Sequence, residues 1–119
     1  MAEVGIPLGR AVLAHRRASY GEAVDALLPV RGRLRSIGAS HAQRDMFEQL
    51  LIDAAWRGGR LDVAAGLLDD RTTVRPGNAW GWKHRASVLA ALGLHGEAES
   101  ARRTLEILRE RQTVNASAA

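Results

Sequence analysis

The sequence contains no cysteine, few aromatic residues and a single lysine, and these scarcities exclude several classes of structure. Without cysteine there is no disulfide framework, thiol nucleophile or cysteine-ligated zinc site. Aromatic residues make up 4% of the 119 residues, and no long segment alternates apolar with polar positions, which argues against β-strands. No apolar run approaches the roughly 18 residues that span a membrane, and residues 1–5 lack the features of a signal peptide. We therefore expect a cytoplasmic protein.

The charge is modestly basic and almost entirely arginine on the positive side. The chain has 17 basic and 13 acidic residues, a formal net charge of +4, and Lys83 is the only basic residue that is not Arg. Abundant Ala and Arg with almost no Lys is typical of a GC-rich genome, and we expect a bacterial source. Acidic residues are interspersed with the arginines, which is unlike a nucleic-acid-binding arm. A basic helical protein associated with nucleic acid is the alternative interpretation.

The remaining composition favours helices. Ala, Leu, Arg and Glu are good helix formers, and Gly and Pro fall in clusters that divide the chain into segments. Helical periodicity predicts segments over residues 6–17, 22–35, 40–56, 61–74, 78–92 and 96–111, followed by a flexible tail at 112–119. Pro29 should kink or split the second segment. Ser40 and Gln43 form a capping-box pattern, and Asn78 is a suitable cap for the fifth segment.

Three segments begin in a similar way and place an alanine at a recurring position. Ala64 and Ala98 are separated by 34 positions, the period of the tetratricopeptide repeat. Ala23 and Ala64 are separated by 41 positions, which predicts a seven-residue insertion near residues 37–39. The repeat register predicts that Trp82 is mostly buried. These features predict an all-α, tetratricopeptide-like right-handed superhelix of about three antiparallel helical hairpins, with units at 4–37, 40–77 and 78–111 in one domain spanning 1–111.

A more specific resemblance lies in the middle of the chain. Residues 38–55 read GASHAQRDMFEQLLIDAA, followed by LLDDR at 67–71 and preceded by YGEAVDALLP at 20–29. These segments resemble the C-terminal part of the tetratricopeptide repeat protein 38 family, over residues 8–93. Ala39 replaces a usual Gly of that family and Asp70 replaces a usual Glu. The resemblance implies a helical repeat scaffold and no defined reaction, and it leaves open that the chain is a remnant of a longer repeat protein.

The first helices of such hairpins line a concave face that commonly binds peptides. Mapped onto this chain, they predict a groove for a protein or peptide partner that presents an acidic or C-terminal segment. The groove residues are His15, Arg16, Gln49, Asp53, Trp56, Arg57, Trp80, Lys83 and Ser87. The spacing of four between Gln49, Asp53 and Arg57 predicts one stripe, with Lys83 supplied by the adjacent hairpin. The alternative is that the tryptophans pack against neighbouring helices and the charges are solvated.

Catalytic and cofactor signatures are missing from the sequence. There is no G-x-S-x-G motif, and Gly58-Gly59 lacks the ending of a phosphate-binding loop. His41 and Asp45 lie four residues apart, but two ligands are too few for a metal site. We therefore expect a non-catalytic module with no cofactor and no metal.

The first helical segment carries more apolar residues than a terminal repeat needs. Ile6, Leu8, Val12 and Leu13 lie there, although terminal repeats require a polar outer face. This pattern predicts either a symmetric homodimer through the N-terminal hairpin or a partner that docks on it.

Overall fold

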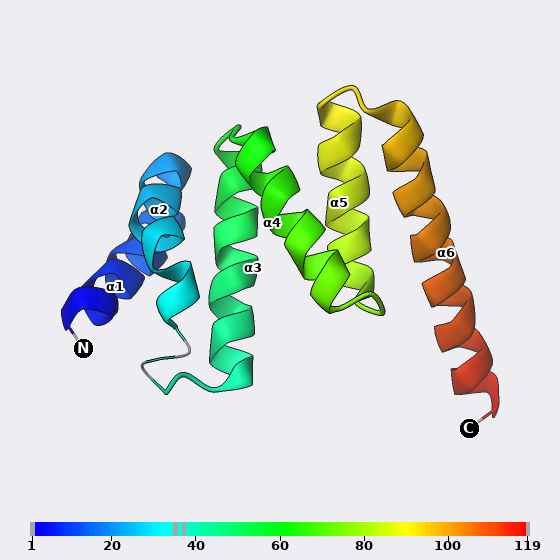
Figure 1. The fold of residues 1–119 in the computed structure, drawn as a ribbon, viewed down its shortest axis with the longest axis horizontal. Coiled ribbons are helices and arrows are strands. Elements are labelled where there is room, and N and C mark those ends of the chain that lie inside the picture. The colour runs from blue at the N-terminus through cyan, green and yellow to red at the C-terminus, as the bar shows by residue number, and fades with distance from the viewer. Residues whose placement is uncertain (1, 35, 37, 119) are drawn as a thin grey trace. The chain divides into compact units, whose positions relative to one another are not determined.

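The computed structural model describes residues 2–34, 36 and 38–118, with side chains described over 7–34, 36 and 38–116, and helices joined by short turns make up most of them. No strand occurs in these residues, which confirms the all-α prediction. The elements in order are α1 (Ala2–Arg16), α2 (Tyr20–Leu27), the 3₁₀ segment η1 (Leu28–Arg33), α3 (His41–Arg57), α4 (Leu61–Val74), α5 (Ala79–Ala91) and α6 (His95–Ala118) (Figure 1).

Pro29 divides the second predicted helix. The α-helix α2 ends at Leu27, and the chain continues as the tighter 3₁₀ segment η1, with Pro29 in its first turn. Proline lacks the N–H that would continue the α-helical ladder, and it is tolerated near the start of a helix because that N–H has no partner there. The prediction of a split at Pro29 is confirmed. Ile37, part of the predicted insertion, lies outside the described residues.

Side-chain caps set the starts of α3 and α5. The Ser40 hydroxyl accepts a hydrogen bond from the Gln43 N–H at 3.1 Å, and the Gln43 side-chain oxygen accepts one from the Ser40 N–H at 2.8 Å. Asn78 Oδ1 accepts from the Gly81 N–H at 2.9 Å. Gly59 follows α3 with a positive φ of 76°, a conformation that glycine adopts without strain. These boundaries agree with the sequence predictions.

The last helix is longer than predicted. Helix α6 extends to Ala118, whereas periodicity predicts its end at Arg111 and a flexible tail over 112–119. Residues 112–118 contain neither Gly nor Pro, so nothing in the backbone stops the helix once α6 has begun. The described side chains of its final turns, residues 111–116, are exposed.

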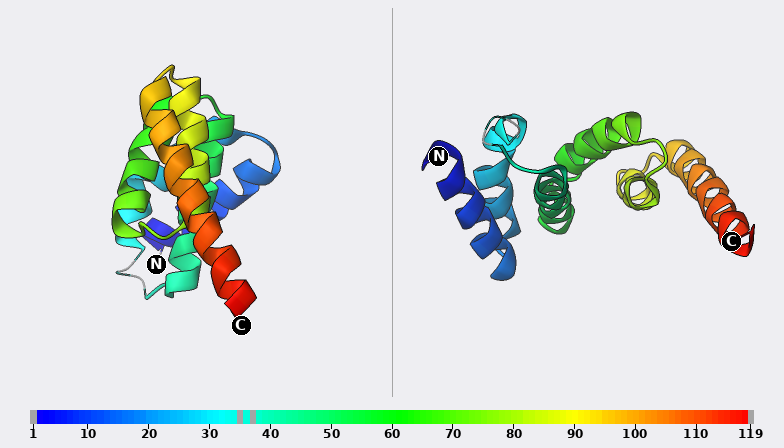
Figure 2. Two further views of the ribbon diagram at one scale, coloured as in Figure 1. Left: turned by 90° about the vertical axis from the view of Figure 1, so that its right-hand side faces the viewer. Right: turned by 90° about the horizontal axis from the view of Figure 1, so that it is seen from below.

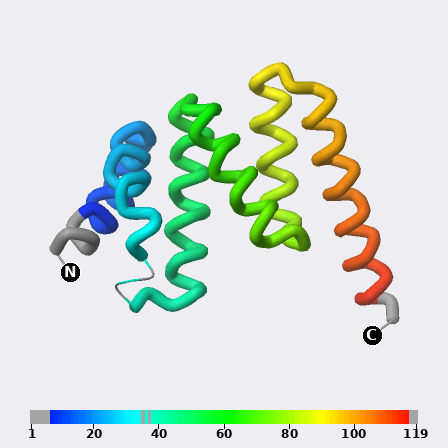
Figure 3. The backbone as a smooth tube through the Cα atoms, in the orientation of Figure 1, coloured from blue at the N-terminus to red at the C-terminus, as the bar shows by residue number. Residues whose placement is uncertain are grey.

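The chain divides into two compact units, residues 1–60 and 61–119. In the first unit α1 packs on α2 and α2 packs on α3 (Figure 2). In the second unit α4 packs on α5 and α5 packs on α6, with the chain reversing direction between the last two helices (Figure 3). The boundary falls within the predicted middle hairpin at 40–77.

Each unit has a core of small and medium-sized apolar side chains. Ala23, Ala64 and Ala98, the alanines that define the predicted repeat, are all 0% exposed. The other core residues of the first unit are Ala11, Ala14, Val24, Leu27, Val30, Leu34, Leu51, Ile52, Ala54 and Ala55. Those of the second unit are Leu67, Leu68, Ala86, Val88, Leu89, Ala101 and Leu105. A small side chain allows two helices to approach closely.

Trp82 is less buried than the repeat register predicts. It is only partly buried, and its indole Nε1 donates to the Pro76 carbonyl oxygen at 2.8 Å. The Arg85 guanidinium lies 5.4 Å from the centre of the Trp82 ring. The polar indole edge therefore faces the α4–α5 turn, and Val88, Leu89 and Ala86 form the core surface of α5 instead.

The capping box at α3 provides a test of the helix boundary. The substitution Ser40→Ala removes the side-chain acceptor for the Gln43 N–H, so we expect the free energy of unfolding to fall by about 1 kcal/mol. Chemical denaturation measures this loss. Thr113→Ala, an exposed position in α6, is the control and should change stability by less than about 0.5 kcal/mol. Equal effects of the two substitutions would contradict the assigned cap.

Candidate functional site

Four polar side chains meet on the first unit, from three different helices. His15 Nε2 lies 2.6 Å from Asp53 Oδ2, and Arg57 Nε donates to Asp53 Oδ1 at 3.0 Å. Arg57 also donates to the Tyr20 hydroxyl at 3.3 Å and lies 5.7 Å from the centre of the Tyr20 ring. The rings of His15 and Tyr20 meet edge to face at 5.6 Å. We call His15, Tyr20, Asp53 and Arg57 the polar cluster.

The local fold brings the polar cluster together. His15 lies in the last turn of α1 and Tyr20 is the first residue of α2, so the short turn between these helices holds both. Asp53 and Arg57 are one turn apart on α3. The hydrogen bond that Arg57 donates to Tyr20, followed by the one that it donates to Asp53, raises the pKa of Arg57. The sequence predicted His15, Asp53 and Arg57 as groove residues but missed Tyr20, because a tyrosine beside a glycine gave no helical-face signal.

Gln49 does not join this cluster. Its side-chain amide donates to Asp45 Oδ2 at 2.9 Å, one turn earlier on α3. The predicted stripe therefore contains the Asp53–Arg57 pair, while Gln49 bonds to Asp45. Trp56 is half-buried and Arg16 is exposed.

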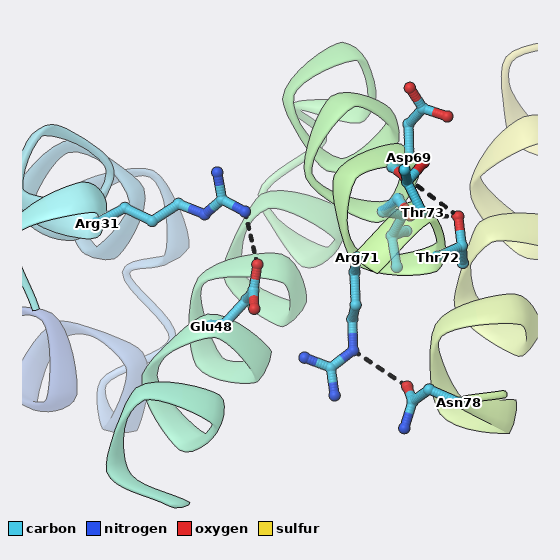
Figure 4. A network of polar contacts seen from close by, with 8 residues as sticks. Arg31, Glu48, Asp69, Arg71, Thr72, Thr73 and Asn78 are labelled. Atoms are coloured by element: carbon cyan, nitrogen blue, oxygen red, sulfur yellow. Dashed lines mark hydrogen bonds and ion pairs between the residues drawn. The ribbon is translucent and has the colours of Figure 1, made fainter. Parts of the chain in front are cut away.

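A second ion pair links the 3₁₀ segment to α3. Arg31 donates to Glu48 Oε1 at 2.6 Å, with the two side chains 32% and 21% exposed (Figure 4). Together with the His15–Asp53 contact, this pair joins α1 and η1 to the same helix. Partly buried ion pairs of this kind fix the orientation of helices more than they add stability.

Polar side chains at the start of α3 form hydrogen bonds with other groups of the same segment. Arg44 donates to the Ala39 carbonyl oxygen at 2.9 Å and contacts His41 Nδ1 at 2.7 Å. His41 and Asp45 thus have partners other than a metal ion. Over the part of the chain that the structure describes, no three His, Cys, Asp or Glu side chains come together as a metal site would require.

The predicted groove residues of the second unit lie on α5. The Trp80 ring stacks on His84 with 4.1 Å between ring centres, and the buried Arg71 guanidinium lies 4.9 Å from the Trp80 ring centre. Arg71 Nε donates to Asn78 Oδ1 at 3.1 Å (Figure 4). Lys83 and Ser87 are exposed. Trp80 therefore packs against side chains of its own unit, and a shared site of Arg57 and Lys83 stays a prediction.

An apolar groove opens on the first unit between α1 and α3. It has a volume of about 430 Å³ and is lined by Leu8, Gly9, Val12, Leu13, Arg16 and Phe47. Leu13 is 47% exposed. Gly9 leaves room because nothing lies within 4 Å of where its Cβ would be. We call these six residues the α1 groove. Ile6, which the sequence places beside them, lies outside the described side chains.

The arrangement of residues around α1 is the reverse of an ordinary amphipathic helix. Its buried positions are the small residues Ala11 and Ala14, at 0% and 2% exposure, while Leu13 points outward and Leu8 and Val12 are only half-buried. Large apolar side chains normally face the core. The sequence signalled the apolar surface of this helix but missed Phe47, whose spacing on α3 matched the core residues.

No protein-family model matches the chain, and no solved structure matches it. Among the described helices, none is both long enough and apolar enough to cross a membrane. Function is therefore inferred from the geometry of the two units.

The His15–Asp53 contact can be tested with a double-mutant cycle. His15→Ala and Asp53→Ala should be non-additive, with a coupling energy of about 0.5 kcal/mol because both side chains are partly solvated. Denaturation of the two single variants and the double variant measures this coupling. The control pair, His41→Ala with Asp53→Ala, should be additive since His41 bonds to Arg44. Additivity in both pairs would contradict the contact.

A second electrostatic test concerns Asp25, which bonds to Arg60 at 2.6 Å. The hydrogen bond from Arg60, aided by its charge, lowers the pKa of Asp25 below the ordinary 3.8. Because the folded pKa is the lower one, the stabilisation is present above pH 3.8 and is lost as the pH falls through the folded value. An NMR titration of the Asp25 carboxyl carbon should show a midpoint below 3.8, and Arg60→Gln should return it towards 3.8. A midpoint that Arg60→Gln leaves unchanged would disprove the assignment, and Arg17→Gln is the control.

Proposed function

We propose that this chain is a non-catalytic, tetratricopeptide-like interaction module that binds a segment of another protein through the α1 groove. The observation that carries the proposal is the exposure of Leu13 beside the half-buried Leu8, Val12 and Phe47. Apolar side chains gathered at an open groove are typical of surfaces that another molecule covers.

The size and composition of the groove support a binding role. A volume of about 430 Å³ falls within the range of pockets that accept ligand side chains, and its lining is apolar except for Arg16. A single charged group among apolar side chains fixes the orientation of a ligand without a large desolvation penalty.

Side-chain contacts between the helices support binding of a partner without a rearrangement of the helices. His15–Asp53 joins α1 to α3, the two helices that line the groove, so its walls are held before a partner arrives. Arg31–Glu48 further fixes α3 to η1. A surface that is already ordered loses less conformational entropy when it binds.

The nucleic-acid alternative receives less support. Arg31, Arg57 and Arg60 in the first unit and Arg85 and Arg102 in the second are all bonded to carboxylates. Phosphate binding would have to compete with these pairs. A nucleic-acid complex would also weaken steeply with added salt, whereas an apolar groove would not.

A capture experiment tests the proposed function. Leu13→Asp places a charge in the α1 groove, and we expect it to abolish capture of protein partners from extracts of the source cell, as read by mass spectrometry. The matched control is Ile107→Asp on α6, because Ile107 is 50% exposed and does not line the groove. Thermal unfolding followed by circular dichroism should show similar midpoints for both variants. Capture that is equal for Leu13→Asp and the wild type would rule out the α1 groove as the binding surface.

A further inference from the structure

We infer that the occupant of the α1 groove is an acidic amphipathic helix, whose apolar side chains enter the groove and whose carboxylate meets Arg16. This inference rests on the proposed function and names the chemistry of the partner. It is drawn from the length of the groove, the position of its one charge and the charges of the helix that forms it.

The length of the groove matches the spacing of side chains on a helix. The lining residues of α1 extend from Leu8 to Arg16, which corresponds to about 12 Å along the helix axis. A partner helix presents apolar side chains at i, i+3 or i+4, and i+7 over a similar distance. Two or three such side chains would contact Leu8, Val12, Leu13 and Phe47.

The charge of the groove selects an acidic partner. Arg16 is the only charged residue that lines it, and Arg16 is exposed. Within the described part of the chain Arg16 has no ion-pair partner, unlike Arg31, Arg57 and Arg60. A guanidinium at the end of an apolar groove is suited to a carboxylate because the planar fork can donate two parallel hydrogen bonds.

The same charges disfavour a second copy of the chain as the occupant. The described charged side chains on and just after α1 are Arg10, Arg16 and Arg17, together with His15, and none of the described side chains of α1 is a carboxylate. A symmetric contact of α1 with α1 of another copy would offer Arg16 only basic, polar or apolar described side chains and no described carboxylate. The predicted homodimer is therefore the competing outcome of the test.

The experiment is a selection from a phage-displayed library of helical peptides. Each peptide is about four turns long, with apolar residues at helical spacing and flanking positions that vary among Glu, Gln and Lys. The immobilised full chain should enrich Glu over Lys, and the Arg16→Glu variant should reverse that preference. Leu13→Asp should retain peptides of neither kind.

The affinity of the best selected peptide is then compared between the wild type and the arginine variants. Fluorescence anisotropy should show that Arg16→Glu raises the Kd by about tenfold or more. The control Arg17→Glu carries the same change of charge at an exposed position outside the groove, and it should leave the Kd nearly unchanged. Equal enrichment of Glu and Lys, or equal effects of the two Arg substitutions, would overturn the inference.

Two further outcomes separate this inference from the proposed function. A dimer detected by light scattering and dissociated by Leu13→Asp would identify a second copy as the occupant and overturn the acidic helix. A selection that yields no peptide, while Leu13→Asp still abolishes capture of protein partners, would overturn the acidic helix and leave the proposed function standing. Failure of both the selection and the capture would remove both proposals.

Discussion

The close approach of helices at fully buried alanines is the constraint on which both units depend. With aromatic residues at 4%, the chain has few large side chains to fill space between elements. It places Ala23, Ala64 and Ala98 at 0% exposure where helices meet. Helices that touch through small side chains pack at short interaxial distances, and Val24, Leu51 and Leu68 fill the space beside them. Each such contact buries less apolar area than a leucine or phenylalanine would.

In both units, polar contacts between helices supplement this core of small apolar side chains. The first unit ties its helices with His15–Asp53 and Arg31–Glu48. In the second unit Arg85 donates to Thr72 at 2.7 Å, and it also lies 3.2 Å from Asp69, so α5 is fixed to α4. Directional contacts of this kind specify how two helices are oriented, whereas alanine contacts permit sliding. The abundance of arginine suits this role because its fork bonds two acceptors at once.

The sequence predicted the local structure well because the signals for helix boundaries are local. Ser40, Pro29 and Asn78 act on backbone groups within a few residues, and the structure places a helix start or break at each one. The end of α6 could not be predicted from its apolar stripe, since a helix continues until a residue stops it. Packing is not local, and this is why Trp82 is more exposed than its repeat position indicated.

The candidate site was predictable only in part, for the same reason. Asp53 and Arg57 lie four residues apart, so their pairing follows from helical geometry. The contact of His15 with Asp53 bridges 38 positions, and no pattern along the chain sets such a distance. Phe47 had the spacing of a core residue and became a wall of the groove, where it lies with Leu8, Val12 and Leu13 of α1.

The α1 groove thus follows from how α1 is packed. A helix that buries Ala11 and Ala14 against its neighbours must direct its larger side chains elsewhere, and at a 100° turn per residue Val12 and Leu13 fall beside and beyond the buried face. Leucine in place of Ala11 or Ala14 would overfill these closely packed positions, so the larger side chains of α1 remain on its outer surface. They form an apolar surface with Arg16 at its end. We propose that a partner covers this surface, and the charge of Arg16 favours an acidic partner.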